Sequence, residues 1–193
     1  MSTLLTESDE SLLNSNLLLL EGAGVCLLND IELDDVKDAI TDDIAAFRAR
    51  PLTTLAALRD PDDNPLFASV WCDTCPRERT TLRDLEECAT ELCAALGAPL
   101  REFVVFPDPD SRSTGSLRLR VGEWDVADVD YDLTSSGPGA GSAELDLIAA
   151  TVPSGVTAVT FEHDDLDAHS VTLFLRNGGD AVELVSAIER ELA

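Results

Sequence analysis

The sequence has 193 residues, of which 45% are hydrophobic, and its 38 acidic and 13 basic side chains give a net charge of −25. Such a chain repels nucleic acid and anionic membranes, so we expect no direct binding to either. The apolar runs are too short to span a bilayer, and no basic segment precedes an apolar one as in a secretory signal. These features predict a cytoplasmic protein and leave its oligomeric state open.

The acidity has two explanations that composition does not separate. One is a solvated acidic surface, as in proteins adapted to high salt, and the other is a field that steers a basic partner into contact. The charge is uneven, because residues 121–193 carry 15 acidic and 2 basic side chains. We therefore expect the last third of the chain to supply most of any electrostatic face.

Residues 1–60 are predicted to form an N-terminal strand or hairpin and a helical segment that pack on the core. Two apolar runs, at 17–20 and 25–28, flank a Glu-Gly-Ala-Gly sequence that is typical of either a hairpin or a helix end followed by a strand. Residues 33–50 are predicted to form one helix before Pro51, because their apolar residues fall at helical spacing: Val36, Ile40, Ile44 and Phe47.

Residues 61–193 are predicted to form an acidic α+β core, in one compact domain with the first segment. Helices are expected at 77–96, 143–151 and 179–193, strands at 66–71, 102–106, 117–121, 123–133, 155–161 and 169–176, and polar loops at 107–116 and 134–142. The last helix is expected to bury one stripe: Val182, Val185, Ile188 and Leu192. Because strands and helices alternate and some strands are tightly linked, we expect a mixed or mainly antiparallel sheet with helices packed on one face.

The stretch GEWDVADVDYDL, residues 122–133, places five carboxylates among apolar residues: Glu123, Asp125, Asp128, Asp130 and Asp132. Since side chains alternate along a strand, the last three share one face, and Val129 and Tyr131 lie on the other. The apolar pattern slips near Ala127, which predicts a β-bulge there.

Two interpretations of this acidic strand stay open. It is a solvent-facing or edge strand whose charges prevent edge-to-edge aggregation, or it is a docking surface for a cationic partner. Calcium is disfavoured because Leu133 and Gly139 stand where a calcium loop has Gly and Glu. We therefore expect neither a metal nor a cofactor.

The five cysteines lack the pattern of a disulfide framework. Cys26, Cys88 and Cys93 are expected to be buried small hydrophobic residues. The segment VWCDTCPRE resembles the redox site of thioredoxin-like proteins, since a Cys-x-x-Cys follows an apolar strand and precedes a helix. That resemblance implies that Cys72 attacks, with its pKa lowered by the helix N-terminus, and that Cys75 resolves. Two ordinary thiols, or a zinc site that needs two more ligands, are the other interpretations.

We find no convincing catalytic constellation, and the histidines His163 and His169 flank an acidic segment that is typical of a solvated turn. Whether the protein is an enzyme stays open, with the balance against it. The sequence favours a non-enzymatic acidic binding protein that docks a basic macromolecular partner, of the inhibitor or toxin-neutralising (immunity-like) kind, through the five carboxylates of 123–132. The alternative is a thioredoxin-like thiol–disulfide protein that uses Cys72 and Cys75.

Overall fold

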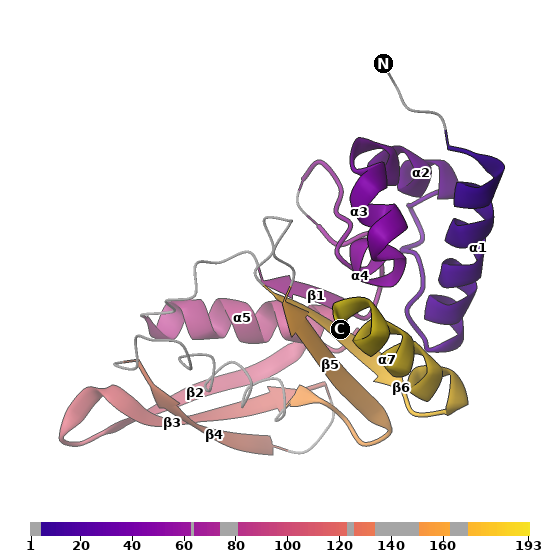
Figure 1. Ribbon diagram of the computed structural model, residues 1–193. Helices are drawn as coiled ribbons and strands as arrows, with labels where there is room; N and C mark the ends of the chain where they lie inside the picture. The colour runs from indigo at the N-terminus through magenta and orange to yellow at the C-terminus, as the bar shows by residue number, and fades with distance from the viewer. Residues whose placement is uncertain (1–4, 63, 74–80, 123–125, 134–150, 163–169) are drawn as a thin grey trace. The chain divides into compact units, whose positions relative to one another are not determined.

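The computed structural model describes residues 5–62, 64–73, 81–122, 126–133, 151–162 and 170–193. In this part the chain forms six helices and two three-stranded antiparallel sheets, which confirms the α+β class (Figure 1). Residue contacts divide the chain into two compact units. The first contains residues 1–73 and 155–193, and the second contains residues 74–154, so the second is an insertion within the first.

The first unit begins with helix α1 (Glu7–Gly22). Its start is fixed by a capping box, in which the Thr6 hydroxyl accepts from the Asp9 backbone N–H at 3.3 Å and the Asp9 carboxylate accepts from the Thr6 backbone N–H at 2.9 Å. The apolar run at 17–20 lies in this helix, and Leu27 forms an isolated antiparallel bridge with Phe67. A helix end followed by extended chain is therefore the correct alternative for this segment.

The single helix predicted for 33–50 is wrong, because the structure has two helices, α2 (Leu33–Asp42) and α3 (Ile44–Ala49). Asp43 separates them in a non-helical conformation, with φ of −135°. Its carboxylate accepts from the Ala46 backbone N–H at 3.0 Å, so it caps α3 instead of continuing α2. Pro51 ends this segment and also occupies the first turn of α4 (Pro51–Ala56), where its missing N–H is tolerated.

The sheet of the first unit has the strand order β1-β6-β5, with all neighbours antiparallel: β1 (Val70–Asp73), β5 (Val156–Glu162) and β6 (Ser170–Arg176). The β5–β6 pairing confirms the strands predicted on both sides of 163–169, a segment that lies outside the described residues. Strand β1 begins later than the predicted residue 66, because Ser69 adopts a φ of +64° that turns the chain just before the strand.

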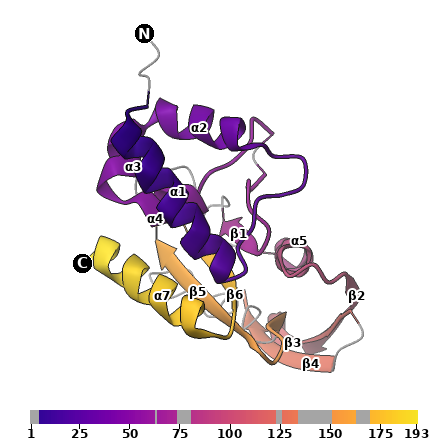
Figure 2. The ribbon, with the colours of Figure 1, turned by 90° about the vertical axis from the view of Figure 1, so that its right-hand side faces the viewer.

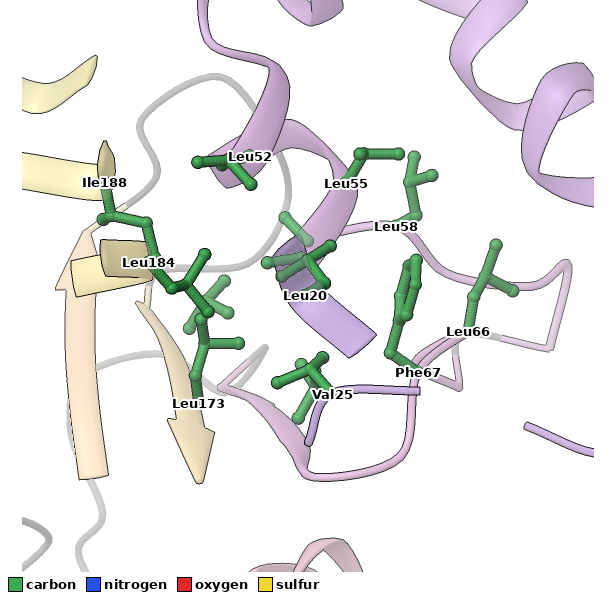
Figure 3. Close-up of a cluster of buried hydrophobic side chains, with 14 of the residues drawn as sticks. Leu20, Val25, Leu52, Leu55, Leu58, Leu66, Phe67, Leu173, Leu184 and Ile188 are labelled. Atoms are coloured by element: carbon green, nitrogen blue, oxygen red, sulfur yellow. The ribbon is translucent and has the colours of Figure 1, made fainter. Parts of the chain in front are cut away.

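Helix α7 (Gly179–Leu192) packs against this sheet, and its side chains join those of the N-terminal helices in one hydrophobic core (Figures 2 and 3). The stripe predicted for α7 is correct only in part. Ile188 is buried and Val185 packs against the core, whereas Val182 and Leu192 are exposed by 68% and 44%. The other buried residues of the helix are Ala181 and Leu184. Helical spacing allowed both stripes, and packing against the sheet selects the one that starts at residue 181.

Two polar contacts link distant segments of the first unit. The Arg48 guanidinium donates to both carboxylate oxygens of Asp9, at 2.8 and 2.7 Å, and so connects α3 to the start of α1. The Glu191 carboxylate accepts from the backbone N–H groups of Leu52 and Thr53, each at 3.0 Å. Glu191 on α7 therefore caps the N-terminus of α4, which has no cap from its own segment.

The second unit contains helix α5 (Leu82–Ala95) and the sheet β2-β3-β4, with β2 (Leu100–Asp108), β3 (Ser111–Val121) and β4 (Val126–Asp132). The long loop predicted for 107–116 is wrong. Strands β2 and β3 continue through most of it, with Phe106 opposite Ser116, and only Pro109 and Asp110 remain in the turn. The polar residues there are strand residues on an exposed hairpin, and composition does not distinguish these from a loop.

Helix α5 covers one face of this sheet. It buries an apolar stripe that includes two cysteines: Leu85, Cys88, Ala89, Leu92 and Cys93. The buried residues of β3 and β4 share one face of the sheet: Leu117, Leu119, Val121, Val129 and Tyr131. Gly97 ends the helix at a φ of +68°, which agrees with the predicted helix end at residue 96. The predicted loop at 134–142 and nearly all of the helix predicted at 143–151 lie outside the described residues.

Candidate functional site

Strand β4 carries the carboxylates that the sequence singles out. Asp128, Asp130 and Asp132 are exposed on one face, while Val129 and Tyr131 are buried on the other. This alternation is as predicted for residues 128–132, and β4 is an edge of the described sheet. Glu123 and Asp125 lie outside the described residues, so the described part of the row has three members. We call Asp128, Asp130 and Asp132 the acidic row.

The predicted bulge at Ala127 is absent from the described strand. Ala127 pairs with Leu119 and Val126 pairs with Arg120, in the same register as the rest of β4. Ala127 is thus in step with Val129 and Tyr131, and the apolar face of β4 continues to Ala127 without an extra residue. The apparent slip in the sequence comes from Val126, an apolar residue at an even-numbered position like the acidic residues that follow it.

Arginines of β3 face the acidic row, and the sequence analysis missed them. The Arg118 guanidinium donates to Asp128 through Nε at 2.9 Å and through Nη2 at 3.3 Å. Arg120 lies 3.4 Å from a carboxylate oxygen of Glu102 on β2. The alternation of LRLRV, residues 117–121, was the available signal, since it places both arginines on the face opposite to Leu117 and Leu119.

These contacts shape the electrostatics of the face. The side-chain hydrogen bond from Arg118 lowers the pKa of Asp128 below its ordinary value, and the same bond raises the pKa of Arg118. Arg118 also lies over the ring of Phe106, 5.4 Å from its centroid, and Phe106 is 45% exposed. The outer face of the sheet thus presents an aromatic ring, two guanidinium groups and a flanking acidic row.

The predicted redox pair is only half described. Cys72 is buried within β1, where it is paired with Val171 of β6, and Cys75 lies outside the described residues. Cys72, the attacking thiol that the resemblance implies, is therefore a strand residue, and Asp73 follows it in the same strand. The helix that follows in the described chain, α5, begins at Leu82.

The other thiols differ from one another. Cys88 and Cys93 are buried as predicted, and burial raises the pKa of the Cys93 thiol to about 11, which keeps it protonated and unreactive near neutral pH. The prediction for Cys26 is wrong, because it is exposed. It lies in the short connection between α1 and Leu27, where the neighbouring Val25 is buried.

Among the described residues, no three His, Cys, Asp or Glu side chains gather as metal ligands would. His163 and His169 lie outside them. No described helix combines the length and the apolar character needed to cross a membrane.

Comparisons with known proteins give no relative for this chain: it matches no protein-family model, and no significant match was found among curated proteins or solved structures. The function must therefore be argued from the site itself.

Proposed function

We propose that this chain is a non-enzymatic acidic binding protein that docks a basic protein partner through the outer face of the β2-β3-β4 sheet. The proposal places it with cytoplasmic inhibitor or toxin-neutralising (immunity-like) proteins, as an analogy of class. The exposed acidic row of β4 carries the proposal. The net charge of −25 supports it, because such a field accelerates encounter with a cationic surface and suppresses encounter with anionic ones.

The geometry of the row supports a protein partner rather than a small cation. Its carboxylates stand at every second residue, so successive side chains are about 6.6 Å apart along the strand. This spacing suits separate Lys and Arg side chains better than one ion, which needs its ligands converged within about 2.5 Å of a common centre.

The contact between Arg118 and Asp128 supports the same conclusion from within the fold. It is a two-point hydrogen-bonded pair on a surface where the Asp128 side chain is still 59% exposed. An arginine of a partner would meet Asp130 in a comparable setting. Phe106, exposed on the same face, supplies an aromatic anchor of the kind that often dominates interface energies.

The first experiment is a pull-down of the tagged chain from its host's lysate at low and at raised salt, with the bound proteins identified by mass spectrometry. We expect a stoichiometric basic partner that dissociates as salt rises. The second step measures the affinity of that partner for Asp130→Lys, which should fall at least about tenfold because a like charge is placed in the contact.

Asp110→Lys is the matched control, since Asp110 is exposed in the β2–β3 turn of the same unit and the change in net charge is identical. The affinity of this control should change much less than that of Asp130→Lys. Equal weakening by both variants would assign the effect to overall charge and would favour salt adaptation as the role of the acidity. Failure to recover a basic partner at either salt would overturn the proposal.

A further inference from the structure

A groove separate from the acidic row lies in the second unit, between helix α5 and the start of strand β2. Its volume is about 600 Å³, within the range of ligand-binding clefts. One wall consists of Glu86, Thr90 and Ala94, and the other includes Leu100 and Phe103. The turn between α5 and β2 closes one end.

The helical wall is a single face of α5. Glu86, Thr90 and Ala94 are four residues apart in succession, so they lie above one another over about 12 Å of helix. All three are exposed, in contrast to the buried stripe through Leu85 and Leu92. This face of α5 is therefore open beside the sheet that the helix covers.

The strand wall of the groove lies where the pairing of β2 with β3 is irregular. The register of β2 against β3 shifts between Leu100 and Glu102, so that Leu100 pairs with Val121 and Phe103 pairs with Leu119. Both partners are buried on the face toward α5. The shift brings Leu100 and Phe103, which are an odd number of residues apart, onto this same face, and both are half-buried along the groove.

In the described part of the chain β2 is hydrogen-bonded to β3 alone, and so it is an edge of its sheet. An edge strand beside a helix is the arrangement in which an extended peptide can add to a sheet, with main-chain hydrogen bonds on one side and a helix as the opposite wall.

The charge and shape of the groove select the occupant. Helix α5 carries four carboxylates and one guanidinium, and Glu86 stands at the end of the groove away from the turn. The end at the turn is lined by Ala94, Ala98 and Leu100, and Arg101 and Glu102 of β2 also line the groove. Glu86 at one end suits a cationic side chain, and the apolar residues at the other end suit an apolar side chain, while the neighbouring Arg101 disfavours a second cation there.

We propose that this groove binds an extended segment of a protein partner, with an apolar side chain at the Ala94 end and a Lys or Arg against Glu86, four residues apart. The spacing follows from the wall, because about 12 Å of helix corresponds to about four residues of strand at 3.3 Å each, and residues four apart share one face of a strand. The inference does not rest on the docking role of the acidic row, since the two sites share no residue.

The test uses the full chain and fluorescently labelled seven-residue peptides, read by anisotropy. The first peptide has a leucine and an arginine four positions apart, separated by threonine and valine. The second has the same composition with the arginine moved one position closer, and the third is the first peptide N-methylated at alternate residues. We expect the first peptide to bind and the other two to bind at least about tenfold more weakly, because each loses either the side-chain register or the strand hydrogen bonds.

Variants of the chain complete the design. Glu86→Lys should lower the affinity for the first peptide at least about tenfold. Glu87→Lys should change that affinity by no more than about twofold, because Glu87 is on the same helix but outside the groove. Ala94→Trp, which fills the groove from an exposed position, should abolish binding. Circular dichroism confirms that each variant is folded.

Four outcomes would overturn the inference: no binding of the first peptide, equal affinity for all three peptides, equal effects of the two charge reversals, or equally tight binding of leucinamide. The last would make the groove a small-molecule site, and the second would reduce the contact to nonspecific charge attraction. None of these outcomes bears on the acidic row, whose test uses different residues.

Discussion

Arg118 and Asp128 lie directly opposite each other on neighbouring strands, and their side chains form a two-point hydrogen-bonded pair across the exposed face of the sheet. The pair occupies one member of the acidic row and leaves a gradient across the face, from the arginines of β3 to the carboxylates at the far edge of β4. An incoming cation can therefore meet Asp130 without first competing with Arg118.

Removing the Arg118 side chain should raise the pKa of Asp128. In Arg118→Ala the pKa of Asp128 should rise toward its ordinary value, because the hydrogen bond from Arg118 is the main cause of the lowering. NMR titration of the Asp128 carboxyl carbon measures this directly. Arg83→Ala, at an exposed position of α5, is the control and should leave the pKa of Asp128 unchanged. An unchanged pKa of Asp128 in Arg118→Ala would contradict the prediction.

The contact between Asp9 and Arg48 should make stability depend on pH. Hydrogen bonds from Arg48 and Thr6 hold the pKa of Asp9 well below its ordinary value of 3.8, so the folded state binds this proton more weakly than the unfolded state. The contribution of Asp9 is therefore present above about pH 4 and is lost as the pH falls toward the folded-state pKa.

Urea unfolding at pH 7 and at pH 3 tests this expectation. Asp9→Asn should be less stable than the natural chain at pH 7, and its stability should fall less between the two pH values. Asp38→Asn, at an exposed position of α2, is the control and should keep the full pH dependence. Parallel losses in all three proteins would contradict a special role for Asp9.

Truncation of two phenylalanines should have very different effects on stability. Phe47 is fully buried in the core of the first unit, and Phe47→Ala should reduce the free energy of unfolding by about 3–5 kcal/mol through lost burial and the cavity left behind. Phe106 is 45% exposed, and Phe106→Ala should change the free energy of unfolding by no more than about 0.5 kcal/mol. Chemical denaturation measures both, and a large loss in Phe106→Ala would show that its ring is structural rather than available for contacts.

A substitution at Ser69 should stabilise the protein. Ser69 has a φ of +64°, a conformation that costs a residue with a Cβ about 1 kcal/mol, so Ser69→Gly should raise the free energy of unfolding by up to about that amount. Gly97, at a φ of +68° with open space around it, offers the reverse test: Gly97→Ala should lower the free energy of unfolding by about 1 kcal/mol. Thermal or urea unfolding of both variants should give shifts of opposite sign.

Features set by local pattern were predictable from the sequence. The alternation at 128–132 and the end of the helix predicted at 77–96 each depend on neighbours within a few residues, and the structure has both. The acidic row could be identified for the same reason, because strand alternation alone puts its members on one face.

Features set by distant partners were not predictable. Helical spacing allows an apolar face of α7 that begins at Val182 or one that begins at Ala181. Only packing against the sheet decides which of the two is buried. The contact of Arg118 with Asp128 requires the register of a hairpin, and the groove requires a register shift at the start of β2. Asp43 looked like one more acidic residue of a long helix, yet its side chain competes for the backbone N–H of Ala46 and divides that helix.

The insertion of the second unit between β1 and β5 has a consequence for biosynthesis. The central strand of the first sheet, β6, and the helix α7 come after the whole second unit in the chain. As the ribosome works from the N-terminus, the inserted unit is complete while the first still lacks the strand that joins its sheet and the carboxylate that caps α4. Until β6 and α7 are synthesised, the apolar faces of the N-terminal helices stay uncovered. We therefore expect the nascent first unit to be the part of this chain that most needs a chaperone.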